Sequence, residues 1–242
     1  MSHPTLPVRE STGIPSVTME QMQEVDRVMI EDLHIDLAQM MENAGRNLAR
    51  VALDRFRPQR TVVLVGSGGN GGGGMVAARH LANWGNDLLV VLGRAREALD
   101  PVPAHQLDVL ERMGVPISTE PESGDLHIDA LIGYSLVGDP RGRPGELITW
   151  LNSQPAPVLS LDTPSGLDVT TGTAGEPSVR ADATLTLAAP KTGLIDSPKV
   201  GELYLADISV PPTVYAAFGL EMPSDLFADS TVVRLVSPSQ RT

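Results

Sequence analysis

The sequence has 242 residues, of which 41% are hydrophobic, and this is enough to bury the core of one generous α/β domain. A formal net charge of −12 and an aromatic content of 3% exclude the basic patches and stacking platforms of nucleic-acid-binding proteins. The absence of cysteine excludes disulfides, thiolate nucleophiles and Cys-ligated zinc. The chain has neither a signal-like start nor a run of about 18 apolar residues, so we predict a cytoplasmic protein without membrane partners.

The first predicted elements are two amphipathic helices, over residues 18–33 and 36–56, in which apolar residues recur at three- and four-residue spacing. The first of these helices has more apolar positions than a single buried face needs. It is therefore a candidate contact in a homodimer, and the alternative is a helix packed on its own sheet.

After Pro58, short β-branched runs alternate with helical segments. The predicted strands cover residues 61–66, 87–93, 127–133, 157–162, 183–189 and 201–208, and the predicted helices cover 74–85, 102–114 and 144–153. This alternation predicts a Rossmann-like three-layer α/β sandwich, with a mostly parallel sheet and helices on both faces. No helix separates the last two strands, so we expect them to form a hairpin at the sheet edge.

The two ends of the chain, residues 1–16 and about 222–242, are rich in Pro and Ser. We expect them to be mobile or draped over the surface. The chain is accordingly predicted to be a single domain over residues 1–242 with a core at about 18–212.

A glycine-rich stretch follows the first strand of this alternation, with seven glycines in the nine positions 66–74. Gly66, Gly68 and Gly71 satisfy the G-x-G-x-x-G pattern, which lets backbone N–H groups approach a phosphate at a helix N-terminus. The alternative is that the glycines only form a tight turn and allow close helix packing. No Lys-Ser or Lys-Thr follows, which excludes a Walker A site. The next strand ends in Arg94 and Arg96 and lacks the acidic residue that grips an adenine ribose.

Polar residues at other strand ends form a candidate oxygen cluster. Asp129 lies inside an apolar strand and Asp162 ends another, and buried carboxylates need partners. With Ser165 and the side-chain oxygen of Asn70 they would suit a hard cation, and the neutral ligands favour a monovalent ion. The alternative for either aspartate is a purely structural, hydrogen-bonded role.

Five motifs, taken together and in order, resemble those of the NAD(P)H-hydrate epimerase family, the YjeF N-terminal domain. They are MMENAGRNLA, VGSGGNGGGGMVAARHL, IDALIGYSLVGDPRG, LSLDTPSGLDVTTG and ADATLTLAAPKTGL, within residues 20–212. The resemblance implies epimerisation of the hydrated nicotinamide cofactors NADHX and NADPHX in metabolite repair. It also implies a potassium site at Asn70, Asp129 and Ser165. The implied substrate-binding residues are Gly69, Asn70, Gly71, Gly72, Gly73, Gly133, Tyr134, Ser135, Leu136, Val137, Gly138, Asp139 and Asp162.

The chain departs from the family pattern at Gly69 and Gly73, where the family usually has Asn and Asp. Two polar groups at the pocket edge are therefore absent, and we expect lower turnover. We assign acid–base catalysis to Asp162 with Lys191 as its charge partner, because inversion requires a hydroxyl to leave with a proton and water to return. A separate NAD(P)H-hydrate dehydratase is the expected functional partner. Two alternatives stay open, a non-catalytic nucleotide-binding or dimerising module and another NAD(P)-dependent enzyme.

Overall fold

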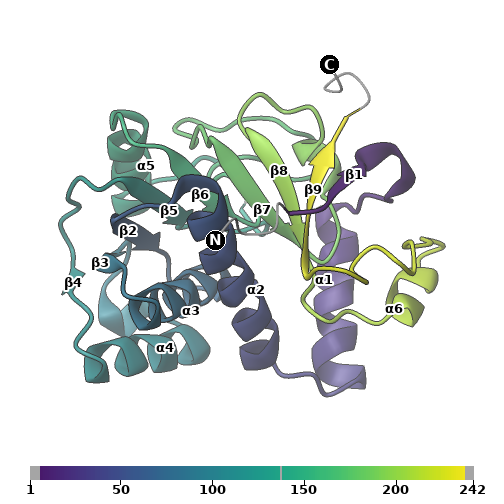
Figure 1. The fold of residues 1–242 in the computed structure, drawn as a ribbon, viewed down its shortest axis with the longest axis horizontal. Coiled ribbons are helices and arrows are strands. Elements are labelled where there is room, and N and C mark those ends of the chain that lie inside the picture. Colours follow the sequence, from purple (N-terminus) through teal and green to yellow (C-terminus); the bar gives the residue numbers. More distant parts are fainter. Residues whose placement is uncertain (1–5, 137, 238–242) are drawn as a thin grey trace.

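A single nine-stranded sheet forms the centre of the computed structural model, which describes residues 6–136 and 138–237. The strand order is β1-β9-β8-β7-β6-β5-β2-β3-β4 (Figure 1). All neighbouring strands are parallel except β8 and β9. The strands are β1 Val8–Glu10, β2 Arg60–Val65, β3 Asp87–Leu92, β4 Ile117–Ser118, β5 Leu126–Ala130, β6 Val158–Leu161, β7 Ala183–Leu187, β8 Glu202–Ala206 and β9 Val232–Val236.

Helices cover both faces of this sheet, which confirms the predicted three-layer α/β architecture (Figure 1). They are α1 Met19–Arg27, α2 Leu37–Val51, α3 Gly69–Asn83, α4 Pro101–Arg112, α5 Arg143–Asn152 and the short α6 Pro212–Ala216. One π-helical turn extends α1 to Asp32 and another extends α2 to Phe56. Thr18 and Gln21 cap the start of α1 with a reciprocal pair of side-chain to backbone hydrogen bonds.

Strand β2 shows how the sequence divides the core between the two faces. Val63 and Val65 pack with residues of α2 and α3, whereas Val62 and Leu64 pack with residues of α5. Successive side chains of a strand point to opposite faces, so a continuous apolar run fills two cores at once. This double burial explains why the apolar run of β2 is uninterrupted from Val62 to Val65.

The strand order reverses at β2, because the chain proceeds from β2 to β3 on one side and returns to β5 on the other. In open parallel sheets, ligands bind at the carboxyl ends of the strands that flank such a switch point. Here those ends lead into the glycine-rich stretch after β2 and the segment that begins at Leu131 after β5.

The predicted hairpin is wrong, because β7 and β8 are parallel, with Ala183 opposite Glu202 and Leu187 opposite Ala206. The connection over residues 188–201 has the length of about a dozen residues that a parallel crossover requires, although it contains only a 3-10 turn at Thr192–Leu194. Lys191 lies on this crossover, where Val17 forms an isolated bridge with it.

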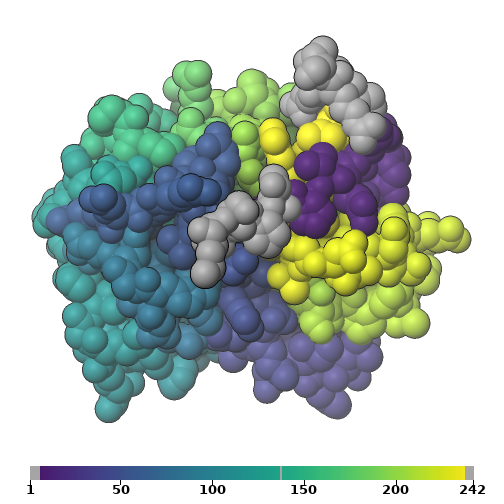
Figure 2. All heavy atoms as spheres, viewed as in Figure 1, coloured from purple at the N-terminus to yellow at the C-terminus, as the bar shows by residue number. Residues whose placement is uncertain are grey.

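The expectation that both ends of the chain are mobile or draped over the surface is wrong for two segments, which form strands of the sheet. β9 pairs antiparallel with β8, and β1 pairs parallel with β9, which closes one edge of the sheet. Figure 2 shows the same arrangement on the surface, where the purple N-terminal segment lies against the yellow C-terminal one. Leu235 and Val233 join the apolar cluster around Leu205, so burial of apolar side chains holds the C-terminal strand in place.

The apolar positions of α1 are mostly satisfied within the chain. Met22, Val25 and Met29 are buried in a cluster with Ala188 and Tyr215, whereas Ile30 and Leu33 are exposed. This packing is the alternative to a dimer contact, and the homodimer stays a prediction. Within the described residues, no helix has the length and apolar character needed to cross a membrane.

His127 of β5 is the basis of a stability prediction. The ring is fully buried and meets the Trp150 ring edge-on at 5.1 Å, and burial lowers the pKa of His127 below its ordinary value. The unfolded chain therefore binds a proton at a higher pH than the folded chain does. The stability that the neutral His127 ring contributes to the fold is complete above about pH 6.5. It is lost as the pH falls from there.

The variant His127→Phe keeps an aromatic ring against Trp150 and removes the titrating group. We expect its melting temperature to fall less than that of the wild type between about pH 7 and pH 5. Thermal denaturation of both proteins across this range measures the difference. Parallel curves for the two proteins would contradict the assignment.

Candidate active site

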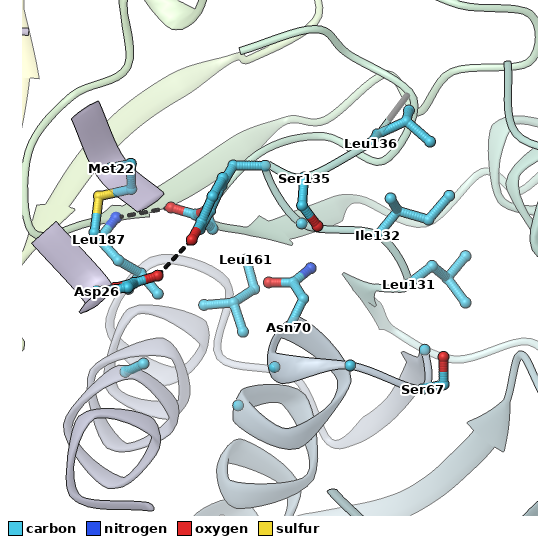
Figure 3. Close-up of a pocket in the computed structure, with 18 of the residues that line it drawn as sticks. Met22, Asp26, Ser67, Asn70, Leu131, Ile132, Ser135, Leu136, Leu161 and Leu187 are labelled. Carbon is cyan, nitrogen blue, oxygen red and sulfur yellow. Dashed lines mark hydrogen bonds between the residues drawn. The ribbon is translucent and has the colours of Figure 1, made fainter. Parts of the chain in front are cut away.

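A cleft of about 860 Å³ opens at the carboxyl ends of β2, β5, β6 and β7, at the switch point of the sheet. Helix α1 and the start of α2 also contribute to its wall (Figure 3). The predicted site residues that line the cleft are Gly69, Asn70, Gly73, Gly133, Tyr134, Ser135, Leu136, Gly138, Asp139, Asp162 and Lys191. Gly71, Gly72, Asp129 and Ser165 are buried beside it, and Val137 lies outside the described residues.

Asp162 and Lys191 form an ion pair at the floor of this cleft, and both side chains are almost completely buried. The Lys191 ammonium donates to Asp162 Oδ1, to Leu187 O at 2.9 Å and to Thr186 Oγ1 at 3.2 Å. These three acceptors use all three N–H groups of the ammonium. A buried charge needs such compensation, and the pair predicted from the sequence is brought together by the β7–β8 crossover.

The two oxygens of Asp162 have different surroundings. Every hydrogen bond from the described residues arrives at Oδ1, including those of Leu187 N at 3.2 Å and Thr186 Oγ1 at 3.4 Å. Oδ2 has no such partner, and it is not enclosed by the protein. Asp162 also adopts a left-handed backbone conformation with φ of 64°, which few non-glycine residues adopt and which recurs at functional sites. The carboxylate therefore presents one fixed oxygen to the lysine and one open oxygen to the cleft.

Asp129 and Ser165 meet behind the cleft wall. The Asp129 carboxylate accepts from Ser165 Oγ at 2.6 Å, Ser165 N at 2.9 Å, Ser160 Oγ at 2.8 Å and Leu131 N at 3.3 Å. None of the described residues places a cationic side chain on it, and burial raises the pKa of Asp129 despite these donors. Ser165 Oγ also accepts from Ile132 N at 2.9 Å.

Asn70 approaches the same backbone segment from α3. A Cβ atom on Gly133 would lie 3.3 Å from Asn70 Cβ and 3.8 Å from its Oδ1. The amide nitrogen of Asn70 is buried without a hydrogen-bond partner among the described residues, and the side chain points into the cleft (Figure 3). Asn70 thus lies beside Gly133, and Ser165 Oγ contacts the preceding residue Ile132, so both side chains meet the segment after β5.

The first turns of α3 explain the glycines. The glycine-rich stretch is helical from Gly69, so the loop is confined to residues 66–68. A Cβ on Gly71 would lie 2.0 Å from Gly66 O, and one on Gly74 would lie 2.5 Å from Ala130 Cβ. A Cβ on Gly69 would meet only Met41 Cε at 3.7 Å. Close packing therefore requires glycine at Gly71 and Gly74, and Gly69 has room for a side chain.

The backbone donors at this helix start are fewer than the sequence pattern indicates. The N–H of Gly72 already donates to Gly68 O at 3.1 Å, and the N–H groups of the following helical residues are engaged in the same way. Only the first N–H groups, those of residues 69–71, remain for an anion. A phosphate at this helix start would therefore meet the N–H groups of residues 69–71, and phosphate binding there stays a prediction.

Comparison with known proteins gives a consistent result. The family model described as YjeF-related protein N-terminus matches residues 37–193. A protein of Dehalogenimonas lykanthroporepellens named NAD(P)H-hydrate epimerase is 45% identical over 96% of this chain and 97% of its own length.

The chain belongs to the YjeF-related N-terminal family.

Two further matches define how far the likeness extends. A protein of Salinibacter ruber named bifunctional NAD(P)H-hydrate repair enzyme Nnr is 37% identical over 83% of this chain, which spans only 42% of that protein. The crystal structure of the yeast protein ynu0 matches with a TM-score of 0.79 at 23% identity and covers 92% of this chain and 100% of its own. The yeast structure supports the fold of this YjeF-related domain.

Asp26 is the cleft residue that sequence reasoning missed. It lies on α1, lines the cleft, and accepts a hydrogen bond from the hydroxyl of Tyr134 (Figure 3). Its sequence signal is an acidic residue next to the buried Val25 on an amphipathic helix, which is ordinary for a solvated face. Of the two arginines after β3, Arg94 lines the cleft, whereas Arg96 pairs with Glu111 on α4.

Proposed function

We propose that this protein is an NAD(P)H-hydrate epimerase that interconverts the R and S forms of NADHX and NADPHX in metabolite repair. The observation that carries the proposal is the buried Asp162–Lys191 pair, whose open carboxylate oxygen faces a cleft at the switch point of the sheet. A cleft of about 860 Å³ is large enough for the nicotinamide end of a dinucleotide. The relatives named as epimerases and repair enzymes support the same reaction.

The proposed chemistry is acid–base catalysis at Asp162. The hydroxyl on the ring carbon next to the nitrogen leaves with a proton, which gives a planar iminium, and water returns on the other face. Asp162 Oδ2 exchanges the proton with the oxygen on the face of the ring that it meets, and Lys191 holds Oδ1 and the orientation of the carboxylate. The Tyr134 hydroxyl bonds Asp26, and no hydrogen bond joins it to Lys191 among the described residues, so the Tyr–Lys relay of an oxidoreductase has no support here.

The substitution Asp162→Asn tests this assignment. We expect the variant to fold and to lose epimerisation by about 10²-fold or more, because an amide does not exchange the proton. Epimerisation is measured by mixing the protein with both epimers and an S-specific dehydratase, which leaves the R form unless it is epimerised. The matched control is Asp87→Asn at the amino end of β3, an exposed position remote from the cleft. An active Asp162→Asn variant would remove Asp162 from the mechanism.

We further propose a potassium ion at Asn70, Asp129 and Ser165. The donor set consists of oxygens with a single carboxylate, which suits a monovalent cation. The buried negative charge of Asp129, without a cationic side chain on it among the described residues, is the charge that such an ion would compensate. The ion would fix the segments after β5 and β6 that carry Tyr134 and Asp162.

Potassium is therefore expected to stabilise the fold. Replacing choline chloride by potassium chloride at the same ionic strength should raise the melting temperature, and a concentration ten times the dissociation constant corresponds to about 1.4 kcal/mol. Asn70→Ala removes one oxygen and should abolish the effect. Equal melting temperatures of the wild type in the two salts would argue against a potassium site.

The altered glycine stretch is proposed to reduce turnover without abolishing it. Gly69 and Gly73 line the cleft and offer no side chain to a substrate, and a lost hydrogen bond costs about 1 kcal/mol. Gly69→Asn fits the available space, whereas Gly73→Asp needs a movement of Leu161, whose Cδ2 would lie 2.8 Å from the new Cβ.

We expect Gly69→Asn to raise the epimerase rate, and the double variant with Gly73→Asp to raise it further once Leu161 has shifted. The rates of the three proteins in the coupled assay measure this. Unchanged rates in active proteins would place the limitation elsewhere. Three inactive proteins that still bind the dinucleotide would favour the non-catalytic binding module, which is the second candidate because of these two glycines.

A separate NAD(P)H-hydrate dehydratase is the proposed functional partner. Epimerisation moves the hydroxyl group between two faces of the ring and leaves the cofactor hydrated, so a reaction that removes water has to follow. The bifunctional relatives, of which this chain spans 42% and 35%, are consistent with a second repair activity.

A further inference from the structure

The cleft contains a second carboxylate that the mechanism above does not use. Asp26 of α1 accepts a hydrogen bond from the Tyr134 hydroxyl at Oδ2. Its Oδ1 has no hydrogen-bond partner among the described residues and is not enclosed. Asp26 and Asp162 thus each present one accessible oxygen to the same cleft, from a helix and from a strand end respectively.

The two carboxylates differ in the charge that faces them. Lys191 donates directly to Asp162, whereas no cationic side chain pairs with Asp26 among the described residues. Burial raises the pKa of Asp26, with the Tyr134 hydrogen bond and the charge of Lys191 acting in the opposite direction. The other titratable groups that face Asp26 are Asp162 and Tyr215, and the Tyr215 hydroxyl donates to Ala188 O at 2.9 Å. A carboxyl group whose pKa is raised by burial keeps its proton to a higher pH and can act as an acid.

The stereochemistry of epimerisation requires proton transfer on both faces of the ring. The hydroxyl leaves from one face and water attacks the other, and a single carboxylate fixed by Lys191 contacts only one face of a bound ring. We propose that Asp26 is the second proton-transfer residue of the epimerase, protonating the hydroxyl that leaves one face while Asp162 deprotonates the water that attacks the other. This role rests on the proposed function.

The Asp26 carboxyl gives its proton to the departing hydroxyl, the C–O bond breaks, and the lone pair of the ring nitrogen forms the C=N bond of the iminium as water leaves. A water then bonds to the same carbon from the opposite face, the C=N electron pair returns to nitrogen, and the proton of that water passes to Asp162. The product state, with Asp26 ionised and Asp162 protonated, is the starting state for the opposite epimer.

The competing explanation is that Asp26 only holds Tyr134 and the segment after β5 in place. Asp26→Asn separates the two, because the amide oxygen still accepts from the Tyr134 hydroxyl and no longer supplies a proton. Tyr134→Phe is the matched variant, since it breaks the same hydrogen bond and keeps the carboxyl group.

We expect Asp26→Asn to lower kcat by about 10²–10⁴-fold in both directions, with little change in substrate dissociation constant, and Asp26→Glu to recover part of the rate. Tyr134→Phe should lose about tenfold or less, which corresponds to one hydrogen bond. The decline of the wild-type rate at high pH should move or disappear in Asp26→Asn. A fully active Asp26→Asn variant, or an equal loss in Tyr134→Phe, would overturn the role of Asp26 while leaving the epimerase assignment intact.

A wild-type protein that does not epimerise overturns the proposed function and this role with it.

A second measurement of the role of Asp26 does not depend on activity. Carboxyl ¹³C NMR, with Asp26→Asn used to assign the signal, should show Asp26 titrating above the ordinary range of about 3.9. Titration at or below that value would exclude Asp26 as the proton donor in an otherwise active enzyme.

Discussion

The buried contact between Lys191 and Asp162 is the constraint on which the rest of the site depends. An ammonium group without solvent is tolerated only when acceptors surround it, and here they come from the ends of β6 and β7. The chain passes from β7 to β8 by a crossover without a regular helix, whose first, mostly buried part carries Lys191 beneath the cleft. The left-handed conformation of Asp162 completes the contact, because it turns the carboxylate toward both the lysine and the cleft.

A second constraint is the close approach of α3 to its neighbours. A Cβ on Gly45 of α2 would lie 2.5 Å from Val76 Cβ, and one on Gly71 would clash with the backbone of Gly66. The glycines thus act mainly by removing side chains between α2, α3 and β2, and they bring the start of α3 next to the switch point. Asn70, at the second position of this helix, then reaches the Ile132–Gly133 backbone. Packing and ligand access are two consequences of the same glycines, so the sequence pattern alone does not separate them.

The sequence predicted the parts of the fold that depend on local pattern. Short runs rich in apolar and β-branched residues located β2, β3, β5, β6, β7 and β8, and helical spacing located α1 and α2. The pairing of β7 with β8 was predicted wrongly, because an absent helix indicates a hairpin only when the connection is short. β9 was missed since its apolar residues stand in a segment rich in Pro and Ser, and only its pairing with β8 shows that they are buried. The candidate site follows the same division: Asp162 was found at a strand end, whereas Asp26 is recognisable only once α1 is packed over the cleft.

The carboxylate groups of three aspartates in and beside the cleft have different partners, and these partners distinguish their roles. Asp129 is enclosed by four hydrogen-bond donors and faces no cationic side chain among the described residues, so the only partners that the protein itself gives its charge are dipoles. Asp162 has a full positive charge on one oxygen and space at the other. The hydrogen-bond partner of Asp26 among the described residues is the phenolic hydroxyl of Tyr134. A charge in a low-dielectric interior is stabilised most by an opposite charge, less by oriented dipoles and least by a single neutral donor. The fold thus gives three identical side chains three kinds of partner, a cation for Asp162, dipoles for Asp129 and one hydroxyl for Asp26. Asp162 and Asp26 are the two with an oxygen open to the cleft.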